Sequence, residues 1–258
     1  MPETESEYLT QLRTKLAHLE QRVAKVTRQI MIQEHEENGF ITSFDYDGTP
    51  VQFYLPLGMS DIIQQIILSQ QTFYESTVLS QIKDRFSGIR SVVDVGSNIG
   101  NHAVFFGAVM GVEKLVCFEP QDSVRATLER NLHLNGLSKA KVKPTLLGAE
   151  RSHARMIRHQ KRNQGATAFT PDPEGDFEVS TLDHEIRGKV DLIKIDVEGM
   201  EEQVLAGAQK LIARERPAVV MEIWRNKKAR YDRISRSFAQ LGYEQVFLSE
   251  FDVLFTPV

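Results

Sequence analysis

The residues whose types and spacing could do chemistry begin in Val92–Gly100, where a β-branched apolar run ends in Asp94 and Gly96. A helical pattern of apolar residues follows from position 103. The stretch therefore predicts a buried strand, a tight turn and a helix N-terminus, which together are typical of a nucleotide-type site. Glycines at 96 and 100 allow a positive φ and a close backbone approach. The alternative is a glycine turn that serves structure alone.

The other residues of this loop favour one class of ligand. A dinucleotide fingerprint needs glycines at 96, 98 and 101, but the sequence has Asn98 and Asn101. A carboxylate at 94 sits poorly beside a pyrophosphate and suits a cationic ammonium or sulfonium ligand. We therefore expect S-adenosylmethionine and not NAD, bound by the loop residues Asp94, Gly96, Ser97, Asn98, Gly100 and Asn101.

Glu119 is the next carboxylate of the expected donor site. It closes a second predicted strand about 20 residues after the glycine turn, where a carboxylate accepts hydrogen bonds from the ribose hydroxyls. Pro120 follows it, ends the strand and is counted in the donor site. The alternative is a surface glutamate that happens to precede a proline.

Three charged residues alternate at the end of a later apolar run, Lys194, Asp196 and Glu198. If the strand continues through them they share one face, and such side chains are rarely buried unless paired. We count Asp196 in the donor site, and both Asp196 and Glu198 are carboxylates that can act as a general base. The alternative is a Lys194 salt bridge that only fixes the strand.

His102 is the second choice of base. It begins a helix, whose dipole disfavours a protonated imidazole and leaves a neutral base. A histidine that is merely hydrogen-bonded at a helix start is the alternative. Glu222 is a further carboxylate within reach, Glu201 and Glu202 are explained at least as well by helix capping, and no ligand spacing demands a metal.

The elements that must position these residues alternate along the chain. Strands are predicted at 91–96, 114–119, 141–147, 190–196 and 217–223, with helices near 101–110, 122–135 and 200–214. This alternation indicates a parallel sheet with helices on both faces, whose carboxyl edge holds the ligand. The runs 244–249 and 252–255 predict an antiparallel hairpin at one edge, and 150–178 reads as a long loop.

The segment before the sheet has its own pattern. Two β-rich runs, 40–46 and 51–54, flank Asp47-Gly48, which predicts a hairpin. Helical patterns at 62–68 and 73–86 follow. These helices lead into the glycine turn and are placed to roof the site.

Residues 9–30 carry a heptad pattern. Its apolar positions alternate in steps of three and four: Leu9, Leu12, Leu16, Leu19, Val23, Val26 and Ile30. Three heptads are about the minimum for a coiled coil. We expect a parallel coiled coil that makes the protein a homo-oligomer. An amphipathic helix lying on its own domain is the alternative.

Composition sets broader limits. With 258 residues and 41% hydrophobic content, the chain can form one full α/β core with an appendage. We divide it into an N-terminal helix (1–38), a hairpin and helical lead-in (39–90) and a donor-binding domain (91–258). The net charge of −4 gives no general attraction to nucleic acid. The single Cys117 excludes a disulfide framework, and an acidic start without a signal-peptide pattern predicts a cytoplasmic protein.

Two basic stretches bear on the acceptor. They comprise Arg151, Arg155, Arg158, Lys161 and Arg162, and then Arg225, Lys227, Lys228, Arg230 and Arg233. Such clusters bind phosphates of a nucleotide-sugar or lipid-linked glycan, or an anionic membrane surface. The default interpretation is a solvated face. No stretch is long and apolar enough to span a bilayer, so any membrane contact would be peripheral.

The motifs together resemble the FkbM-type methyltransferases. The resemblance rests on Asp94 to His102, Phe118-Glu119-Pro120, Asp191 to Glu201, Arg216-Pro217 before Glu222, and Asn163 to Ala166. It covers roughly residues 60–255 and leaves the heptad outside. It implies a class I, Rossmann-like methyltransferase fold, S-adenosylmethionine as donor, and O-methylation, most often of a sugar hydroxyl in a glycolipid, polysaccharide or natural product. Ser97 stands where many relatives have alanine. For such a methyl transfer we expect Asp196 to lie nearest the donor methyl group and Glu198 to orient the acceptor hydroxyl. Either carboxylate can accept the proton of that hydroxyl.

Three functions follow as hypotheses. We favour an O-methyltransferase acting on a sugar-containing or small-molecule acceptor, including phosphorylated or lipid-linked forms. An RNA methyltransferase would use the basic stretches as its electrostatic footprint, but the net charge is negative and no RNA-binding module is recognisable. A non-catalytic binding module with the coiled coil as scaffold is the third, and the intact Asp94, Glu119 and Asp196 argue against it.

Overall fold

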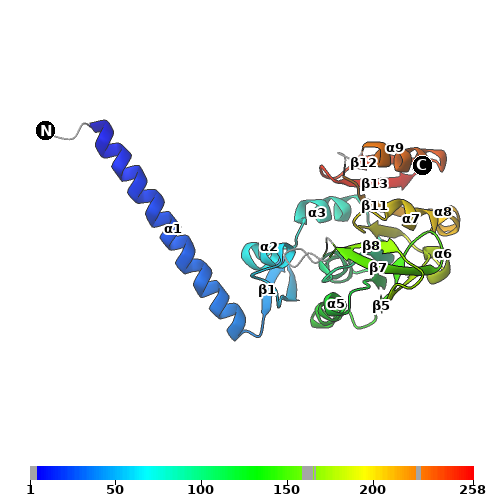
Figure 1. Ribbon diagram of the computed structural model, residues 1–258, viewed down its shortest axis with the longest axis horizontal. Coiled ribbons are helices and arrows are strands. Elements are labelled where there is room, and N and C mark those ends of the chain that lie inside the picture. Colours follow the sequence, from blue (N-terminus) through cyan, green and yellow to red (C-terminus); the bar gives the residue numbers. More distant parts are fainter. Residues whose placement is uncertain (1–4, 159–164, 166, 225–227) are drawn as a thin grey trace.

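The computed structural model describes residues 5–158, 165, 167–224 and 228–258. Its main sheet contains β3 (Ser91–Val95), β4 (Lys114–Phe118), β5 (Lys141–Lys143), β10 (Leu192–Ile195), β11 (Ala218–Glu222), β12 (Tyr243–Phe247) and β13 (Asp252–Pro257). The strand order is β12-β13-β11-β10-β3-β4-β5 (Figure 1). Five neighbouring strands, β11, β10, β3, β4 and β5, are parallel to one another. Strand β13 pairs antiparallel with β11 and with β12, so β12 and β13 form a hairpin at that edge of the sheet. The predicted mostly parallel α/β fold is therefore confirmed.

The strand order reverses between β3 and β10. From β3 the chain moves outward to β4 and β5, and it then returns to the other side of β3 for β10 and β11. The register places Asp94 directly opposite Lys194. Open α/β sheets bind ligands at the carboxyl end of such a switch point, and both predicted loops leave the sheet there.

Helices cover both faces of the sheet. They are α2 (Ile62–Gln70), α3 (Ser76–Arg85), α4 (Asn101–Val104), the π-helix η1 (Phe105–Val109), α5 (Asp122–Leu134), α6 (Leu182–Glu185), α7 (Glu201–Ala206), α8 (Gln209–Glu215) and α9 (Lys228–Gln240). Side chains of a strand alternate between faces, so β3 gives Val92 to one core and Val93 to the other. Helix α9 is absent from the sequence prediction.

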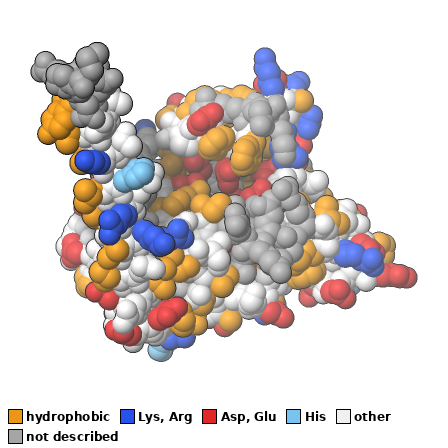
Figure 2. Space-filling view, turned by 60° about the vertical axis from the view of Figure 1, so that its left-hand side comes forward, with side chains coloured by type: hydrophobic (Ala, Val, Ile, Leu, Met, Phe, Trp, Pro, Cys, Tyr) orange, Lys and Arg blue, Asp and Glu red, His pale blue; other side chains and the backbone are white. Residues whose placement is uncertain are grey.

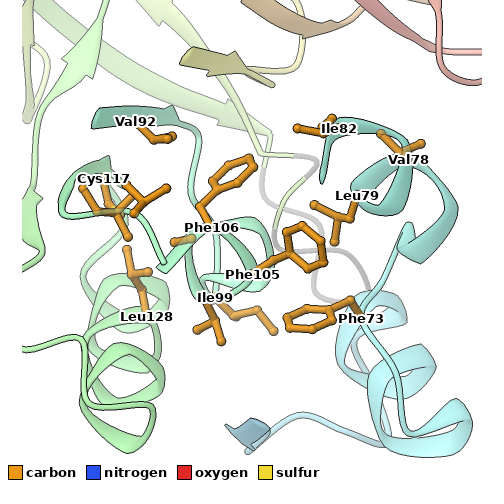
Figure 3. Close-up of a cluster of buried hydrophobic side chains, with 14 of the residues drawn as sticks. Phe73, Val78, Leu79, Ile82, Val92, Ile99, Phe105, Phe106, Cys117 and Leu128 are labelled. Atoms are coloured by element: carbon orange, nitrogen blue, oxygen red, sulfur yellow. The ribbon is translucent and has the colours of Figure 1, made fainter. Parts of the chain in front are cut away.

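The lead-in segment shares the first of these cores. Strands β1 (Ile41–Tyr46) and β2 (Thr49–Tyr54) pair antiparallel, and Asp47 and Gly48 both have positive φ as a two-residue type I′ turn requires. The hairpin prediction is confirmed. Phe73 packs edge-on against Phe105, with 5.1 Å between ring centroids. Figure 3 shows how aromatic and aliphatic side chains of α3, β3, η1 and α5 meet in this core.

Two predictions between residues 141 and 180 are wrong, one of a strand and one of a loop. The predicted strand 141–147 is broken at Pro144, which has no N–H for the ladder, and β6 (Leu146–Leu147) belongs to another sheet. The predicted long loop contains β7 (Ser152–Arg158), β8 (Ala168–Pro171) and β9 (Phe177–Ser180). These strands form a second sheet in the order β6-β9-β7-β8. Exposed polar residues alternate with few apolar ones in β7, so the sequence pattern of a strand is weak there.

The predicted helix 200–214 is interrupted. A Cβ atom at Gly207 would lie 2.0 Å from the carbonyl oxygen of Gly148. The backbone between β6 and β7 therefore passes directly against Gly207. Helix α7 ends before Gly207 and α8 begins after it, and only glycine permits the close approach of the Gly148 backbone.

Helix α1 (Glu5–Glu37) extends away from the rest of the molecule in Figure 1. The side chains from Tyr8 to Ile30 are all exposed. The alternative of an amphipathic helix lying on its own domain is therefore wrong. Pairing with a second helix stays a prediction. Within the described residues no helix is long and apolar enough to cross a membrane.

Candidate active site

The loop after β3 is held by its neighbour strand. The backbone N–H groups of Gly96 and Ser97 donate to the carbonyl oxygen of Phe118, at 3.1 and 3.0 Å. Ser97 Oγ donates to the carbonyl oxygen of Asp94 at 2.8 Å and is buried. The serine therefore stabilises the turn from within.

Both glycines of the loop have a positive φ, 75° at Gly96 and 90° at Gly100, which disfavours any other residue there. A Cβ atom at Gly96 would lie 1.8 Å from the carbonyl oxygen of Asp196, and one at Gly100 would lie 2.7 Å from Leu128 Cδ1. Gly96 thus lets the loop after β3 touch the loop after β10. This contact joins the two ends of the candidate site.

A buried ion-pair network lies beneath the loop. Lys194 Nζ is 3.3 Å from Asp94 Oδ1 and 3.3 Å from Asp196 Oδ2, and it donates to the carbonyl oxygen of Gly96 at 2.8 Å. Burial acts to lower the pKa of Lys194, but the charges of Asp94 and Asp196 outweigh it and raise that pKa. The ammonium group therefore stays charged. The salt bridge that was the alternative explanation for Lys194 is present, although its partner Asp196 also lines a cavity.

Asp94 has no exposed surface. Burial raises its pKa, and the charge of Lys194 acts against that rise. Its carboxylate faces the lysine and lines none of the described cavities. The sequence placed Asp94 beside a cationic ligand, whereas in this structure the cation at its side is Lys194.

Glu119 follows β4 and is 4% exposed. Its carboxylate accepts the backbone N–H groups of Asn98 at 3.1 Å and Gln121 at 2.9 Å. Burial raises the pKa of Glu119 to about 7, against the lowering effect of these hydrogen bonds. The alternative of a surface glutamate is wrong, because this carboxylate is buried and lines two cavities.

Those two cavities adjoin at the carboxyl ends of β3, β4 and β10. They share Gly96, Glu119, Gly165 and Asp196. The first is narrow and mostly apolar, and its other walls include Pro120, Gln121, Leu146, Thr167, Phe169, Val197 and Met200. The second has a volume of about 250 Å³, and its other walls are Ile63, Tyr74, Glu75, Asn98, Glu198, Glu222, Trp224 and Phe251.

The second cavity is acidic. Figure 2 shows acidic side chains inside a hollow of the surface with hydrophobic side chains at its edge. Burial acts to raise the pKa of Asp196, but the charge of Lys194 and a hydrogen bond from Glu222 leave that pKa below its ordinary value. Burial and the charge of Asp196 raise the pKa of Glu222 to about 10. At neutral pH, therefore, Glu222 is protonated and donates to an ionised Asp196.

His102 is not one of the residues that line this cavity. The residue is 8% exposed, and Nε2 is 3.5 Å from Glu75 Oε2. Burial lowers the pKa of His102 to about 3, and the charge of Lys194 contributes. The expected neutral imidazole is thus present, but its weak basicity and its position suit a group that orients Glu75.

Asn101 holds the same segment from the other side. Its side chain accepts the N–H of Tyr74 and donates to the carbonyl oxygen of Tyr74, both at 2.9 Å. Asn101 is buried and lines neither cavity. The sequence analysis predicted that Asn101 contacts the donor. In this structure it instead holds the backbone of Tyr74, just before α3.

The strand β10 ends at Ile195, before Asp196 and Glu198. The prediction that Lys194, Asp196 and Glu198 share one strand face is therefore wrong for Glu198. Glu198 has a φ of 45° and Gly199 a φ of 106°, so the chain turns here. The turn still brings Glu198 to the wall of the same cavity as Asp196.

The sequence analysis missed Tyr74, Glu75 and Phe251 as residues of the site. Glu75 has a φ of 57° at the start of α3, a conformation that costs energy in a residue other than glycine. Burial raises the pKa of Glu75 to about 7, with the charges of Asp252 and Asp196 adding to the rise. The rings of Trp224 and Phe251 are in contact at an interplanar angle of 39°, with 5.0 Å between their centroids. A positive φ is not visible in the sequence, so no signal there identifies Glu75.

The basic stretches are partly neutralised. Arg230 Nη1 donates to Glu201 at 2.9 Å and Arg233 donates to Glu202 at 2.7 and 2.9 Å. Glu201 also accepts the N–H of Gly199 at 2.7 Å, which supports its structural role at the start of α7. Arg155 pairs with Asp172 at 3.0 Å. Lys161, Arg162, Asn163, Gln164, Ala166, Arg225, Lys227 and the side chain of Arg158 lie outside the described part of the chain.

The lining of the two cavities matches the chemistry of S-adenosylmethionine. A buried carboxylate beside an apolar slot, next to a glycine turn, fits a ribose and an adenine ring. Among the described residues, no three His, Cys, Asp or Glu side chains come together as metal ligands.

Comparison with one solved structure supports the fold. The crystal structure of Methyltransferase FkbM from Methylobacillus flagellatus KT matches with a TM-score of 0.52 and 17% identity over 75% of this chain, which spans about half (52%) of that protein. An rRNA methylase from Streptococcus thermophilus matches with a TM-score of 0.47 and 14% identity, over 70% of this chain and 93% of that one. No curated protein matches this sequence. The family model described as the methyltransferase FkbM domain matches residues 94–244. That range is more than half of the chain and holds Asp94, Glu119 and Asp196, and the chain belongs to the FkbM methyltransferase family.

Proposed function

We propose that this protein is an S-adenosylmethionine-dependent O-methyltransferase whose acceptor is a hydroxyl group of a sugar-containing or similar neutral molecule. Membership in the methyltransferase family supports methyl transfer. The observation that carries the proposal is the pair of adjoining cavities. One is apolar, the other is acidic and aromatic, and they share Glu119 and Asp196.

The donor would occupy the apolar cavity and the shared edge. Leu146, Phe169 and Val197 provide flat apolar walls for an adenine ring. Glu119 accepts two backbone hydrogen bonds and a long one, at 3.5 Å, from Gln121 Nε2. A carboxylate offers about four acceptor positions, so one ribose hydroxyl can use the remaining position and the other can displace the long bond. S-adenosylmethionine supplies an activated methyl group on a sulfonium, so the protein has to align the acceptor oxygen and help remove its proton.

Asp196 is our choice for the group that receives the acceptor's hydrogen bond. It lies at the boundary of both cavities. Lys194 keeps it ionised, and the protonated Glu222 holds its orientation. An ionised carboxylate accepts from a hydroxyl and is favoured further as that proton becomes acidic during methyl transfer. Glu198 lines the acceptor side only and is our choice for orienting the hydroxyl.

A neutral polyol fits the acceptor cavity better than a polyanion does. Five carboxyl side chains line it, and none of the lysine and arginine side chains that the structure describes does. Hydroxyl groups donate to carboxylates, whereas a phosphate group would be repelled by them. Trp224, Phe251 and Tyr74 offer aromatic surface to the apolar face of a sugar ring. The phosphate or lipid of a linked acceptor would therefore lie outside this cavity.

The test is transfer of a labelled methyl group from S-adenosylmethionine into glycan, lipid and RNA fractions. We expect label in the glycan or glycolipid fraction, in a methyl ether. Asp196→Asn should lower kcat by about 10²- to 10⁴-fold, the usual contribution of general-base assistance. Asp122→Asn removes an exposed carboxylate on α5 and serves as the matched control.

Two outcomes would contradict this assignment. Label confined to RNA would support an RNA methyltransferase. A His102→Ala variant that alone loses turnover, while Asp196→Asn and Glu198→Gln remain active, would make the histidine the base. Donor affinity, measured separately by calorimetry, distinguishes a lost chemical step from lost donor binding.

A further inference from the structure

Helix α1 presents an apolar stripe to solvent along most of its length. The seven heptad residues, from Leu9 to Ile30, are each between 44% and 59% exposed. Leucine, valine and isoleucine side chains in an unbroken stripe are costly to leave in water. At 1.5 Å per residue the helix is about 50 Å long, and the stripe covers its outer two thirds. This surface lies far from the candidate active site (Figure 1).

We propose that the stripe is covered by helix α1 of a second copy of this chain, in a parallel two-stranded coiled coil. In heptad notation the a positions are Leu9, Leu16, Val23 and Ile30, and the d positions are Leu12, Leu19 and Val26. β-Branched residues at a and leucine at d favour two parallel strands, and half of the a positions and most of the d positions follow that rule. None of the a and d positions from Leu9 to Ile30 carries a charged residue.

The charges beside the stripe support the parallel arrangement. In a parallel pair, each g residue faces the e residue five positions later in the partner. Lys15 would face Glu20 of the second copy, and the reciprocal pair is identical. The remaining g–e pairs of the stripe, including Arg22 with Thr27, contain no two like charges. An antiparallel pair that keeps the apolar layers would instead bring Lys15 beside Arg22, twice.

The C-terminal end of helix α1 is anchored firmly to the rest of the chain, residues 39–258, which we call the catalytic part. His35 is buried, its Nε2 donates to the carbonyl oxygen of Leu55 at 2.9 Å, and its Nδ1 accepts from Thr42 Oγ1 at 3.3 Å. The N–H of Phe40 donates to the carbonyl oxygen of His35 at 2.8 Å. Because both helices are parallel and each is anchored in this way, the two catalytic parts lie at the same end of the coiled coil.

The first test is the mass of the full chain in solution, measured by sedimentation at micromolar concentration. We expect twice the mass of one chain. Leu16→Lys with Val23→Lys places charges in two a layers and should halve that mass. The control Thr14→Lys with Gln21→Lys adds the same charges at outward f positions and should leave the dimer intact. Equal thermal unfolding of the catalytic part in both variants shows that the chain has folded.

The second test reports orientation. Leu12→Cys places a thiol at a d position, where parallel helices bring identical residues together. Mild oxidation should then link two chains, whereas Gln21→Cys, on the outer face, should not cross-link. The native Cys117 is fully buried and does not compete.

Four results would overturn the proposal. A wild-type chain that is monomeric at these concentrations would mean that a membrane surface or another protein covers the stripe. A trimer or larger assembly would contradict two strands. An unchanged mass in the double a-position variant would remove the stripe from the interface, and a dimer in which Leu12→Cys does not cross-link would exclude parallel pairing. None of these results depends on the proposed methyl transfer.

Discussion

The buried carboxylate Glu119 makes the affinity for the donor depend on pH. Burial raises its pKa to about 7, so roughly half of the molecules carry the protonated form at neutral pH. Only the ionised form accepts hydrogen bonds from both ribose hydroxyls, because a protonated carboxyl uses one oxygen as a donor. Donor affinity should therefore rise as the pH rises through 7.

The size of the effect follows from this pKa. At pH 8 almost all of Glu119 is ionised, and at pH 6 about one molecule in eleven is, so the dissociation constant should increase about tenfold between these values. Glu119→Gln lacks the ionisable group. Its affinity at pH 8 should be lower by about ten- to a hundredfold, the cost of a charge-assisted hydrogen bond of about 1.5–3 kcal/mol.

The assay is titration calorimetry of S-adenosylmethionine binding between pH 6 and pH 8. The α-amino group of the ligand also titrates near this range, and it does so equally for every variant. The difference in slope between the wild type and Glu119→Gln therefore reports Glu119 alone. Glu75→Gln is the matched control, since the pKa of Glu75 is also raised to about 7 but this residue lines only the acceptor cavity.

Equal pH slopes in the wild type and Glu119→Gln would refute this reasoning. So would a slope that disappears in Glu75→Gln and persists in Glu119→Gln. Either result would mean that the donor does not bind through the carboxylate after β4.

Two further predictions concern stability. Lys194→Met leaves Asp94 buried without its counter-ion and should lower the free energy of unfolding by about 3–5 kcal/mol; a loss below 1 kcal/mol in urea titration would show that the pair contributes little. Gly96→Ala should lose about 2–4 kcal/mol, because its Cβ would meet Asp196 O at 1.8 Å and its φ is positive. The control Gly48→Ala has a similar φ of 80° but open space around it, so equal losses in both would contradict the steric argument.

Local signals determined much of the fold. The β-branched run before Asp94, the glycines of the loop and the apolar helical spacing after it all act within about a dozen residues, so their structure is readable from the sequence. The same holds for the Asp47-Gly48 turn, whose two positive φ values follow from residue type. The position of Glu119 also follows, because a residue that closes a parallel strand must lie at the carboxyl edge of the sheet.

Contacts between distant segments decided where the secondary structure departs from the pattern of apolar residues in the sequence. Residues 200–214 have a continuous helical pattern, but Gly207 meets the backbone of Gly148, and two helices result. Strand β7 forms because β9 and β8 pair with its two edges. A strand with one exposed face and polar neighbours gives little local signal, so only the pairing reveals it.

The sequence by itself determined which carboxylates reach the sheet edge, because Glu119, Asp196 and Glu222 each lie at the end of a predicted strand. Only the tertiary structure decided their protonation. Burial and the mutual distances of these groups set their pKa values, and Lys194, opposite Asp94 in the register, keeps Asp196 ionised while Glu222 holds a proton. Glu75 enters the site from a helix that precedes the sheet, so no spacing along the chain foretells it. Type and order are local properties, whereas charge state depends on neighbours that the chain brings together only when it folds.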